Sequence, residues 1–352
     1  GNVLFVLFNK GFSVPKPLCI TTEAYDLFVD HNNLRESVLM ELHRKDMKDM
    51  RWEEIWDISL RIRNLFVRGD IPRDLQQEIV DARQQSFGDS PLVIRSSTPQ
   101  EDNIRHSFAG LHDSFVNVRD TKDLMNNIKA VWSSLWSDRA ILYRQELGLE
   151  VLESTMAIVV QEFIKGDTSG VLFTQNPIDP SCMILEAVHG LNQGLVDGTI
   201  EPDQWTLTRG ENRIAEHRSP KQRLSTISSS SGGGVKRTSI DESSGSLPPL
   251  NEEQILRIAR IGTDLENFYS TPQDIEWTFS NNQLFLLQSR PITSGEPEKT
   301  TDKRSWYLSL TRSYDNLCEL WHTIENILLP EMDENYRKLA GHELENLSDR
   351  EL

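Results

Sequence analysis

Apolar residues recur along the chain with two spacings, one helical and one strand-like. Ile55, Ile58, Ile62 and Leu65 lie three or four residues apart, which predicts a helix over residues 52–68. Similar spacing predicts helices at residues 23–50, 75–86, 122–147 and 251–270, and a short helix before Gly11. Most of the predicted helices therefore fall in the first half of the chain.

Short apolar runs bounded by glycine and proline predict strands, most of them after residue 150. They lie at residues 91–95, 156–163, 170–174, 183–188 and 204–207. Two further strands, residues 274–279 and 284–289, flank Asn281-Asn282 and predict a β-hairpin with a tight turn. Helices and strands mixed in this order indicate an α+β, or mixed α/β, fold class.

Changes in composition suggest how the chain is divided. Residues 213–249 include a Ser/Gly-rich run with few apolar side chains, which we interpret as a flexible surface insertion in a first domain at residues 1–293. The polar residues 294–304 predict a linker. Residues 305–352 carry a helical apolar stripe that stops at Pro330, and we interpret them as the truncated start of a mainly helical domain. Because the chain begins without Met, we expect a fragment or a processed form.

The overall charge excludes some partners. With 37 basic and 54 acidic residues the net charge is −17, which argues against non-specific binding to nucleic acid. The three cysteines are far apart and predict neither a zinc site nor a disulfide framework. No stretch is long enough to span a bilayer. We therefore expect a cytoplasmic protein without nucleic-acid or membrane partners.

The predicted hairpin carries polar side chains that suit a metal and a phosphate. If the turn is tight, Glu276 lies roughly opposite Gln288 across the strand pair. A carboxylate beside an amide oxygen suits Mg²⁺, which also binds substrate phosphates. Arg290, on the same face of its strand as Gln288, can bind a phosphate through two hydrogen bonds. The alternative is an exposed hairpin face with a Glu–Arg salt bridge.

Arg95 lies at the end of an apolar strand and begins a polar loop. Hydroxyl residues follow it at once, and Gly110 lies further along the loop. A cation at a strand end, beside hydroxyls and a glycine that lets the backbone approach an anion, is what a phosphate site needs. The P-loop sequence GxxxxGK[ST] does not occur in the chain. A polar surface loop remains the alternative.

Several motifs, taken in order, resemble those of the family of phosphoenolpyruvate synthase, pyruvate phosphate dikinase and rifampicin phosphotransferase. The resemblance covers about residues 1–293. Its motifs are Val93-Ile94-Arg95-Ser96-Ser97, Glu101-Asp102, Ser107-Phe108-Ala109-Gly110, Val131-Trp132-Ser133-Ser134-Leu135-Trp136, Val159-Val160-Gln161, Gly170-Val171-Leu172-Phe173-Thr174, Pro272-Gln273-Asp274-Ile275-Glu276-Trp277 and Leu287-Gln288-Ser289-Arg290-Pro291-Ile292-Thr293.

The resemblance implies an ATP-grasp-like fold, in which two lobes close on ATP and Mg²⁺. By matched position it implies two catalytic arginines that bind phosphate, two residues that hold the metal, and further residues around the nucleotide. These are Arg95 and Arg290 for phosphate, Glu276 and Gln288 for the metal, Gly110 and Ser114 in the loop over the nucleotide, Gln161 beside the adenine, and Glu186 near the metal and the ribose. From its residue type alone, the Gln161 amide could read a base edge or make an ordinary strand-end hydrogen bond.

Three features depart from the family pattern. The family has a phosphate-binding Lys in a Gly-Gly-Lys motif, which alignment places just before Gly1. Its Gly-Leu-Gly-Glu turn reads Gly190-Leu191-Asn192-Gln193 here, so we expect a stiffer and less acidic turn. The Thr-Ser-Gly-Gly-type motif that holds the phosphoryl-carrier histidine is not present; His106 and His112 flank the Arg95 loop but lack that context.

The resemblance implies the ATP-binding domain of a phosphoenolpyruvate-synthase-like phosphotransferase. Such an enzyme passes phosphate from ATP through a histidine of a separate domain, so we expect that domain elsewhere in the chain or in a partner. The acceptor would be pyruvate or a small-molecule hydroxyl, as in a rifampicin-phosphotransferase-like antibiotic kinase. The departures leave open a nucleotide-binding regulatory module that has lost catalysis.

Overall fold

The computed structural model describes residues 2–45, 50–98, 111–146, 154–176, 178–211, 213–223, 225–240 and 245–292, with the isolated residues 326, 329, 330 and 332. The chain divides into two compact units, Gly1–Pro297 and Glu298–Leu352. All the strands described below belong to the first unit. The helical segment predicted at residues 305–352 lies almost wholly outside the described residues.

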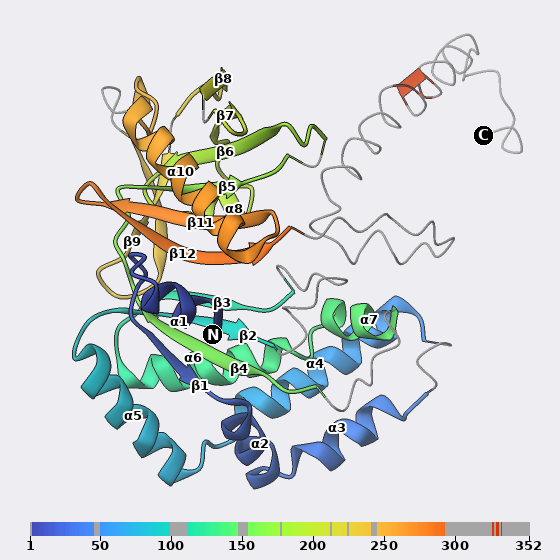
Figure 1. The fold of residues 1–352 in the computed structure, drawn as a ribbon. Coiled ribbons are helices and arrows are strands. Elements are labelled where there is room, and N and C mark those ends of the chain that lie inside the picture. Colours follow the sequence, from blue (N-terminus) through green and yellow to red (C-terminus); the bar gives the residue numbers. More distant parts are fainter. Residues whose placement is uncertain are drawn as a thin grey trace, which may run out of the picture. The chain divides into compact units, whose positions relative to one another are not determined.

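The first half of the chain builds a four-stranded antiparallel sheet with helices packed on it. The strand order is β1-β4-β2-β3, with β1 (Pro17–Ile20), β2 (Leu92–Ser97), β3 (Ser114–Val118) and β4 (Ala157–Glu162). The helices of this half are α1 (Asn2–Asn9), α2 (Thr22–His31), α3 (Leu34–Leu42), α4 (Trp52–Arg68), α5 (Arg73–Phe87), α6 (Thr121–Ser134) and α7 (Asp138–Glu146). Figure 1 shows α2, α4, α5 and α6 on one side of this sheet.

The second half builds a six-stranded antiparallel sheet in the order β12-β11-β5-β6-β7-β8. Helix α10 (Glu252–Tyr269) runs across it (Figure 1) and contacts β5 and β11. A short helix, α8 (Gln193–Val196), follows β6. The strands are β5 (Thr168–Phe173), β6 (Cys182–His189), β7 (Asp203–Thr208), β8 (Arg213–Arg218), β11 (Gln273–Ser280) and β12 (Gln283–Pro291).

These elements confirm the predicted mixture of helices and strands, and the apolar spacing explains most of it. Helix α4 has the predicted bounds, and Ile55, Ile58 and Ile62 are 5% exposed or less. No described helix combines the length and hydropathy needed to cross a membrane.

Two predicted long helices are each broken in two, and polar side chains explain both breaks. At the first, Asn33 has a left-handed φ of 51°, and the Asn32 side chain bonds Phe28 O at 2.8 Å and Asp70 O at 2.9 Å. At the second, the Ser137 hydroxyl accepts the Ala140 amide at 3.2 Å and so starts α7. Apolar spacing does not register such breaks, because the buried stripe continues through them.

The segment interpreted as a flexible surface insertion contains regular structure, because residues 213–240 include three strands. Strand β8 extends the six-stranded sheet, while β9 (Ser225–Ser229) and β10 (Val235–Ser239) form an antiparallel hairpin. Few apolar residues are needed here because the hairpin buries Ile227, at 7% exposed, and otherwise relies on backbone pairing. The Ser/Gly-rich composition of this segment therefore gave no sign that it forms strands.

One apolar core joins the helix-packed face of the six-stranded sheet to parts of the other half. It contains Leu172, Ile258 and Trp277, together with Leu7 from α1 and Val159 from β4. Backbone bonds reinforce the junction, since Leu286 N in β12 donates to Ser13 O at 2.9 Å. The two sheets are therefore held against each other by packing as well as by the chain that connects them.

The helical half buries a histidine that makes its stability sensitive to acid. Burial, and next the positive charge of Arg144, lower the pKa of His112 from 6.5 to about 4. An unfolded chain takes up this proton near pH 6.5, whereas the folded chain resists it until about pH 4. Stability should therefore be complete above pH 6.5 and fall by up to about 3 kcal/mol as the pH drops toward 4.

The matched comparison is His112→Gln, which keeps a polar side chain but cannot titrate. Urea unfolding of both proteins from pH 7.5 to 4.5 measures the difference. We expect the wild type to lose more stability than the variant over this range. Parallel pH profiles would show that His112 does not titrate as described.

Candidate functional site

The β11–β12 hairpin aligns the side chains predicted to hold a metal. Glu276 pairs with Gln288, as the sequence predicted, and the turn residues Asn281 and Asn282 have φ values of 49° and 62°. Asparagine tolerates this left-handed region better than most residues, which explains why the two asparagines form the turn. A register shift between Glu276 and Trp277 separates the site end of the hairpin from its turn end.

The pairings across the six-stranded sheet place Glu186 in the same row as the hairpin residues. Val171 of β5 pairs with Glu276 on one side and Glu186 on the other. Paired residues point to the same face of a sheet, so Glu186, Glu276 and Gln288 share a face. The neighbouring residue Leu172 points to the other face, where Gly262 of α10 lies against it. The carboxylates therefore face away from α10.

Arg95 reaches this row from the four-stranded sheet. Its Nη1 donates to Glu276 Oε2 at 3.0 Å and to Gln288 Oε1 at 2.6 Å. The side chains of Arg95 and Glu276 are 21% and 17% exposed, so water screens the ion pair only partly. Three residues predicted from two distant motifs thus meet at one point.

Arg290 is held by a different carboxylate. Its Nε and Nη2 both lie 2.6 Å from Asp274 Oδ2, and the Asp274 side chain is 9% exposed. Burial raises the pKa of Asp274, while the Arg290 charge opposes that shift. Asp274 belongs to one of the family-like motifs but was given no role; its position two residues before Glu276, opposite Arg290 in the hairpin register, is the signal that could have found it.

Gln161 lies on the face of the four-stranded sheet that Arg95 also uses. Arg95 pairs with Val159, and Gln161 is two residues further along β4. Gln161 is 2% exposed, and its Nε2 has no hydrogen-bond partner among the described residues. A buried donor without a partner costs free energy unless something accepts its hydrogen bond. The amide is thus suited to a ligand acceptor.

The remaining predicted residues lie around this centre to different degrees. Ser114 in β3 pairs with Arg95 and is exposed. Glu186 accepts a hydrogen bond from Gln204 Nε2 at 2.8 Å. Gly110 lies outside the described residues, as does His106.

The donor set fits a hard cation that shares its ligands with a substrate. Within the described ranges, no group of three or more His, Cys, Asp or Glu side chains is arranged to hold a metal. Glu276 and Gln288 supply one carboxylate and one amide oxygen close together, since both accept from the same Arg95 nitrogen. Mg²⁺ binds such oxygens while keeping water and phosphate ligands, so these residues fit Mg²⁺ bound with a phosphate group.

The turn after β6 keeps the glycine that its backbone requires. Gly190 has a φ of 79°, and a Cβ there would lie 2.1 Å from Thr226 Oγ1 and 2.5 Å from Ile227 O. Asn192, where the family pattern has a second glycine, has an ordinary helical φ of −66° and ψ of −16°. The side chain of Asn192 therefore causes no backbone strain. The backbone geometry gives no reason to expect a stiffer turn than one with glycine at this position.

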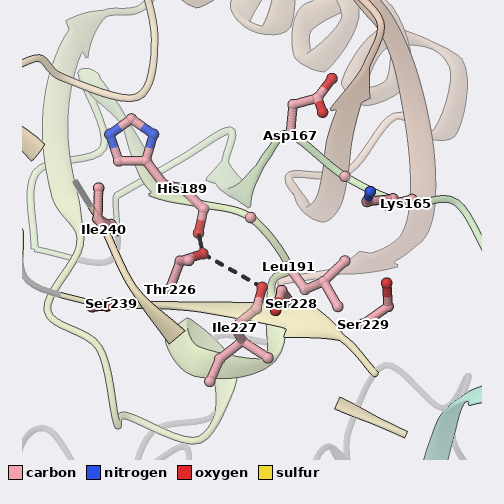
Figure 2. A pocket seen from close by; sticks show the side chains of 12 residues that line it. Lys165, Asp167, His189, Leu191, Thr226, Ile227, Ser228, Ser229, Ser239 and Ile240 are labelled. Carbon is pink, nitrogen blue, oxygen red and sulfur yellow. Dashed lines mark hydrogen bonds between the residues drawn. The ribbon is translucent and has the colours of Figure 1, made fainter. Parts of the chain in front are cut away.

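A cavity of about 300 Å³ lies beside this turn. Figure 2 shows its lining, with Thr226 pointing to the backbone carbonyl of His189. Residues 165–167, which lead from β4 to β5, form part of the lining together with residues 189–191, 226–229 and 239–240. None of the predicted site residues is among them, so this cavity is distinct from the Arg95 centre.

Comparison with known proteins gives a family match over most of the chain. Residues 2–307 match the model of the pyruvate phosphate dikinase AMP/ATP-binding domain. Rifampicin phosphotransferase of Bacillus subtilis is 30% identical over 86% of this chain and 35% of its own length. Rifampicin phosphotransferase of Bacillus cereus is 31% identical over 82% and 33%, respectively. A probable phosphoenolpyruvate synthase of Methanocaldococcus jannaschii is 28% identical over 85% and 26%.

The chain thus spans about a third of the length of these relatives or less. Among solved structures, D-alanine–D-alanine ligase of Bacillus anthracis matches at a TM-score of 0.32 and 9% identity, over 82% of this chain and 54% of that one. A structural match this distant has no bearing on function.

The partly buried Arg290–Asp274 pair should be coupled more strongly than a surface pair. Arg35 and Asp26 provide the comparison, because their side chains are 53% and 38% exposed. In double-mutant cycles with alanine, we expect about 1–3 kcal/mol of coupling for the buried pair and less than about 1 kcal/mol for the surface pair. Urea unfolding of both cycles measures this difference, and equal coupling would contradict the assigned geometry.

Proposed function

The chain belongs to the pyruvate phosphate dikinase AMP/ATP-binding domain family, and from this we propose that it binds ATP with Mg²⁺ as the nucleotide-binding part of a phosphotransferase. One observation carries the proposal beyond the family match. Arg95 from one sheet meets Glu276 and Gln288 from the other, so a cation and two oxygen ligands converge from the two halves. This combination suits a phosphate chain that carries a metal.

Two arginines bind the phosphates in this proposal. Arg95 and Arg290 present planar guanidinium groups that match phosphate oxygens, and their positive charge offsets the charge that develops during phosphoryl transfer. Asp274 supports this role by fixing Arg290 through two contacts of 2.6 Å. A fixed cation needs little reorganisation when the phosphate arrives.

Glu276 and Gln288 would hold Mg²⁺ through the same oxygens that accept from Arg95. With those oxygens engaged, the Arg95 guanidinium would be available to a phosphate. A bound Mg²⁺ would supply neutralisation of phosphate charge. Binding of metal and nucleotide is therefore expected to be cooperative, because each helps to separate Arg95 from Glu276 and Gln288.

The nucleoside is positioned by the remaining residues. Gln161 donates its buried amide to the adenine, and Glu186, in the same cross-strand row as Glu276, lies on the ribose and metal side. Gly110 is proposed to lie over the nucleotide, and so is Ser114, although Ser114 is the first residue of strand β3 and not part of the loop that the sequence predicted. The unpartnered Nε2 of Gln161 supports the base assignment, because a bound acceptor relieves the cost of its burial.

For the whole protein we propose a phosphoenolpyruvate-synthase-like reaction, in line with the names of its relatives. Phosphate passes from ATP to a histidine of a separate domain and then to pyruvate or to a small-molecule hydroxyl. Within this scheme residues 1–293 form the ATP-binding domain, residues 294–304 a linker and residues 305–352 the start of a helical domain. The chain spans at most 35% of these relatives, and the proposal assigns the histidine to a separate domain of the same protein or to a partner.

Arg95→Ala should weaken binding of Mg·ATP roughly 10- to 100-fold, the range expected for loss of a charged hydrogen bond. Isothermal titration calorimetry measures the affinity with Mg²⁺ and with EDTA. The matched control is Arg35→Ala, whose exposed guanidinium pairs with Asp26 and Asp30 and should leave the affinity unchanged.

Glu276→Gln completes this experiment by removing charge while keeping an oxygen. It should reduce the gain in ATP affinity that Mg²⁺ provides, more than it reduces affinity in EDTA. If neither Arg95→Ala nor Glu276→Gln changes binding, the site is not where we place it.

Gln161→Leu should separate base recognition from phosphate binding. Leucine fills a similar volume without a donor, so ATP affinity should fall about 10-fold, while affinity for inorganic triphosphate with Mg²⁺ stays the same. Competition titrations with both ligands measure the two effects. Equal losses for ATP and triphosphate would place Gln161 outside the base site.

A further inference from the structure

The β9–β10 hairpin is anchored at its base on the six-stranded sheet. Ile227 forms a parallel bridge with Gly190 just after β6, and Leu191 N donates to Ile227 O at 2.9 Å. The Thr226 hydroxyl donates to His189 O, the contact drawn in Figure 2. Gly190 leaves no room for a side chain beneath β9. The base of the hairpin is therefore fitted closely to the strand that carries Glu186.

The tip of the same hairpin is bonded to the four-stranded sheet. Asn117 of β3 donates from Nδ2 to Ser230 O at 2.8 Å and to Gly234 O at 2.7 Å. Its own carbonyl accepts the Gly234 amide at 3.2 Å. The side chain and the backbone carbonyl of Asn117 thus bond both sides of the hairpin turn. The hairpin therefore connects the two sheets.

Asn117 is suited to this contact by its conformation and by its burial. Its φ is 57°, in the left-handed region that asparagine tolerates, and it is 0% exposed. Arg119 Nε donates to its Oδ1 at 3.2 Å, which orients the amide so that Nδ2 faces the hairpin. Both ends of the amide are therefore satisfied, and few other side chains could replace it.

A second contact links the six-stranded sheet to the first half of the chain. In the site row, Gln288 lies in β12 and Glu186 in β6. The bond from Leu286 to Ser13 ties β12 to the segment between α1 and β1, two residues from Gln288, and the β9–β10 hairpin ties the sheets together beyond the end of β6. The row is thus held against the Arg95 sheet near both of its ends. Separation of the sheets at the β6 side requires the Asn117 contacts to break.

We propose that Asn117 is a positioning residue that fastens the β9–β10 hairpin as a strap between the two sheets, and that nucleotide exchange requires this strap to release. The inference rests on the proposed function, since it assigns the strap to ATP entry and departure. Asn117 touches no nucleotide. It acts by setting how often the sheet that carries Arg95 separates from the sheet that carries Glu186.

Asn117→Gly tests the tie, because glycine accepts the positive φ but removes both side-chain bonds. Hydrogen exchange of the nucleotide-free protein should show faster exchange at the Gly234 amide and no change at the Leu191 amide at the hairpin base. Stopped-flow fluorescence with mant-ATP and Mg²⁺ should show dissociation and association both faster, with dissociation raised about 10-fold for the loss of two neutral hydrogen bonds.

Gly233→Ala is a second variant made from the hairpin side. Gly233 has a φ of 100°, which strains alanine, and an added Cβ would lie 3.4 Å from Asn117 O. We expect it to change the same rates in the same direction without altering β3. The matched control is Asn33→Gly, an exposed asparagine with a φ of 51° in the helical half, which should keep wild-type rates.

The outcomes separate the two proposals. Failure of the wild type to bind mant-ATP would overturn the proposed function and this inference with it. Wild-type binding with unchanged rates and unchanged Gly234 exchange in Asn117→Gly would overturn the strap alone. Loss of stability in Asn117→Gly with unchanged mant-ATP rates would assign Asn117 a purely structural role and would also overturn it.

Discussion

The site depends on one interaction, the hydrogen bonds from Arg95 in the four-stranded sheet to Glu276 and Gln288 in the six-stranded sheet. It joins residues 181 and 193 positions apart in sequence, so both sheets must be formed and in register before it exists. A slip of one residue in β11–β12 would turn Glu276 to the α10 face. The two-asparagine turn, the apolar core that joins the six-stranded sheet to the first half and the Asp274 contact that fixes Arg290 all stabilise this geometry.

Much of the fold follows from apolar spacing, and its failures have a common cause. Helix α4 and the β11–β12 pairing were predicted closely because burial on one face leaves a strong periodic signal. The breaks at Asn32 and Ser137 depend on single side chains bonding backbone groups, which periodicity does not register. The β9–β10 hairpin was missed because its strands bury little apolar surface and are held by pairing and by contacts distant in sequence.

The site was predictable to a different degree. The family-like motifs indicate Arg95, Glu276 and Gln288, and the strand alternation in the sequence predicts that Glu276 and Gln288 lie opposite each other. The direct contact of Arg95 with both was not foreseen, nor was the pairing of Arg290 with Asp274. Asn117 belongs to none of the family-like motifs. Its proposed role follows only from its left-handed backbone and from its bonds to the β9–β10 hairpin. Residues that act through distant partners leave little trace in local sequence.

If the site binds Mg·ATP, Arg95 must leave Glu276 and Gln288 to hold a phosphate while those two residues hold the metal. A crystal structure with a non-hydrolysable ATP analogue and Mg²⁺ tests this most directly. We expect the Glu276 and Gln288 oxygens on the metal, the Arg95 guanidinium on a phosphate and the Gln161 amide on the adenine. An analogue bound elsewhere, with Arg95 still on Glu276 and Gln288, would contradict it.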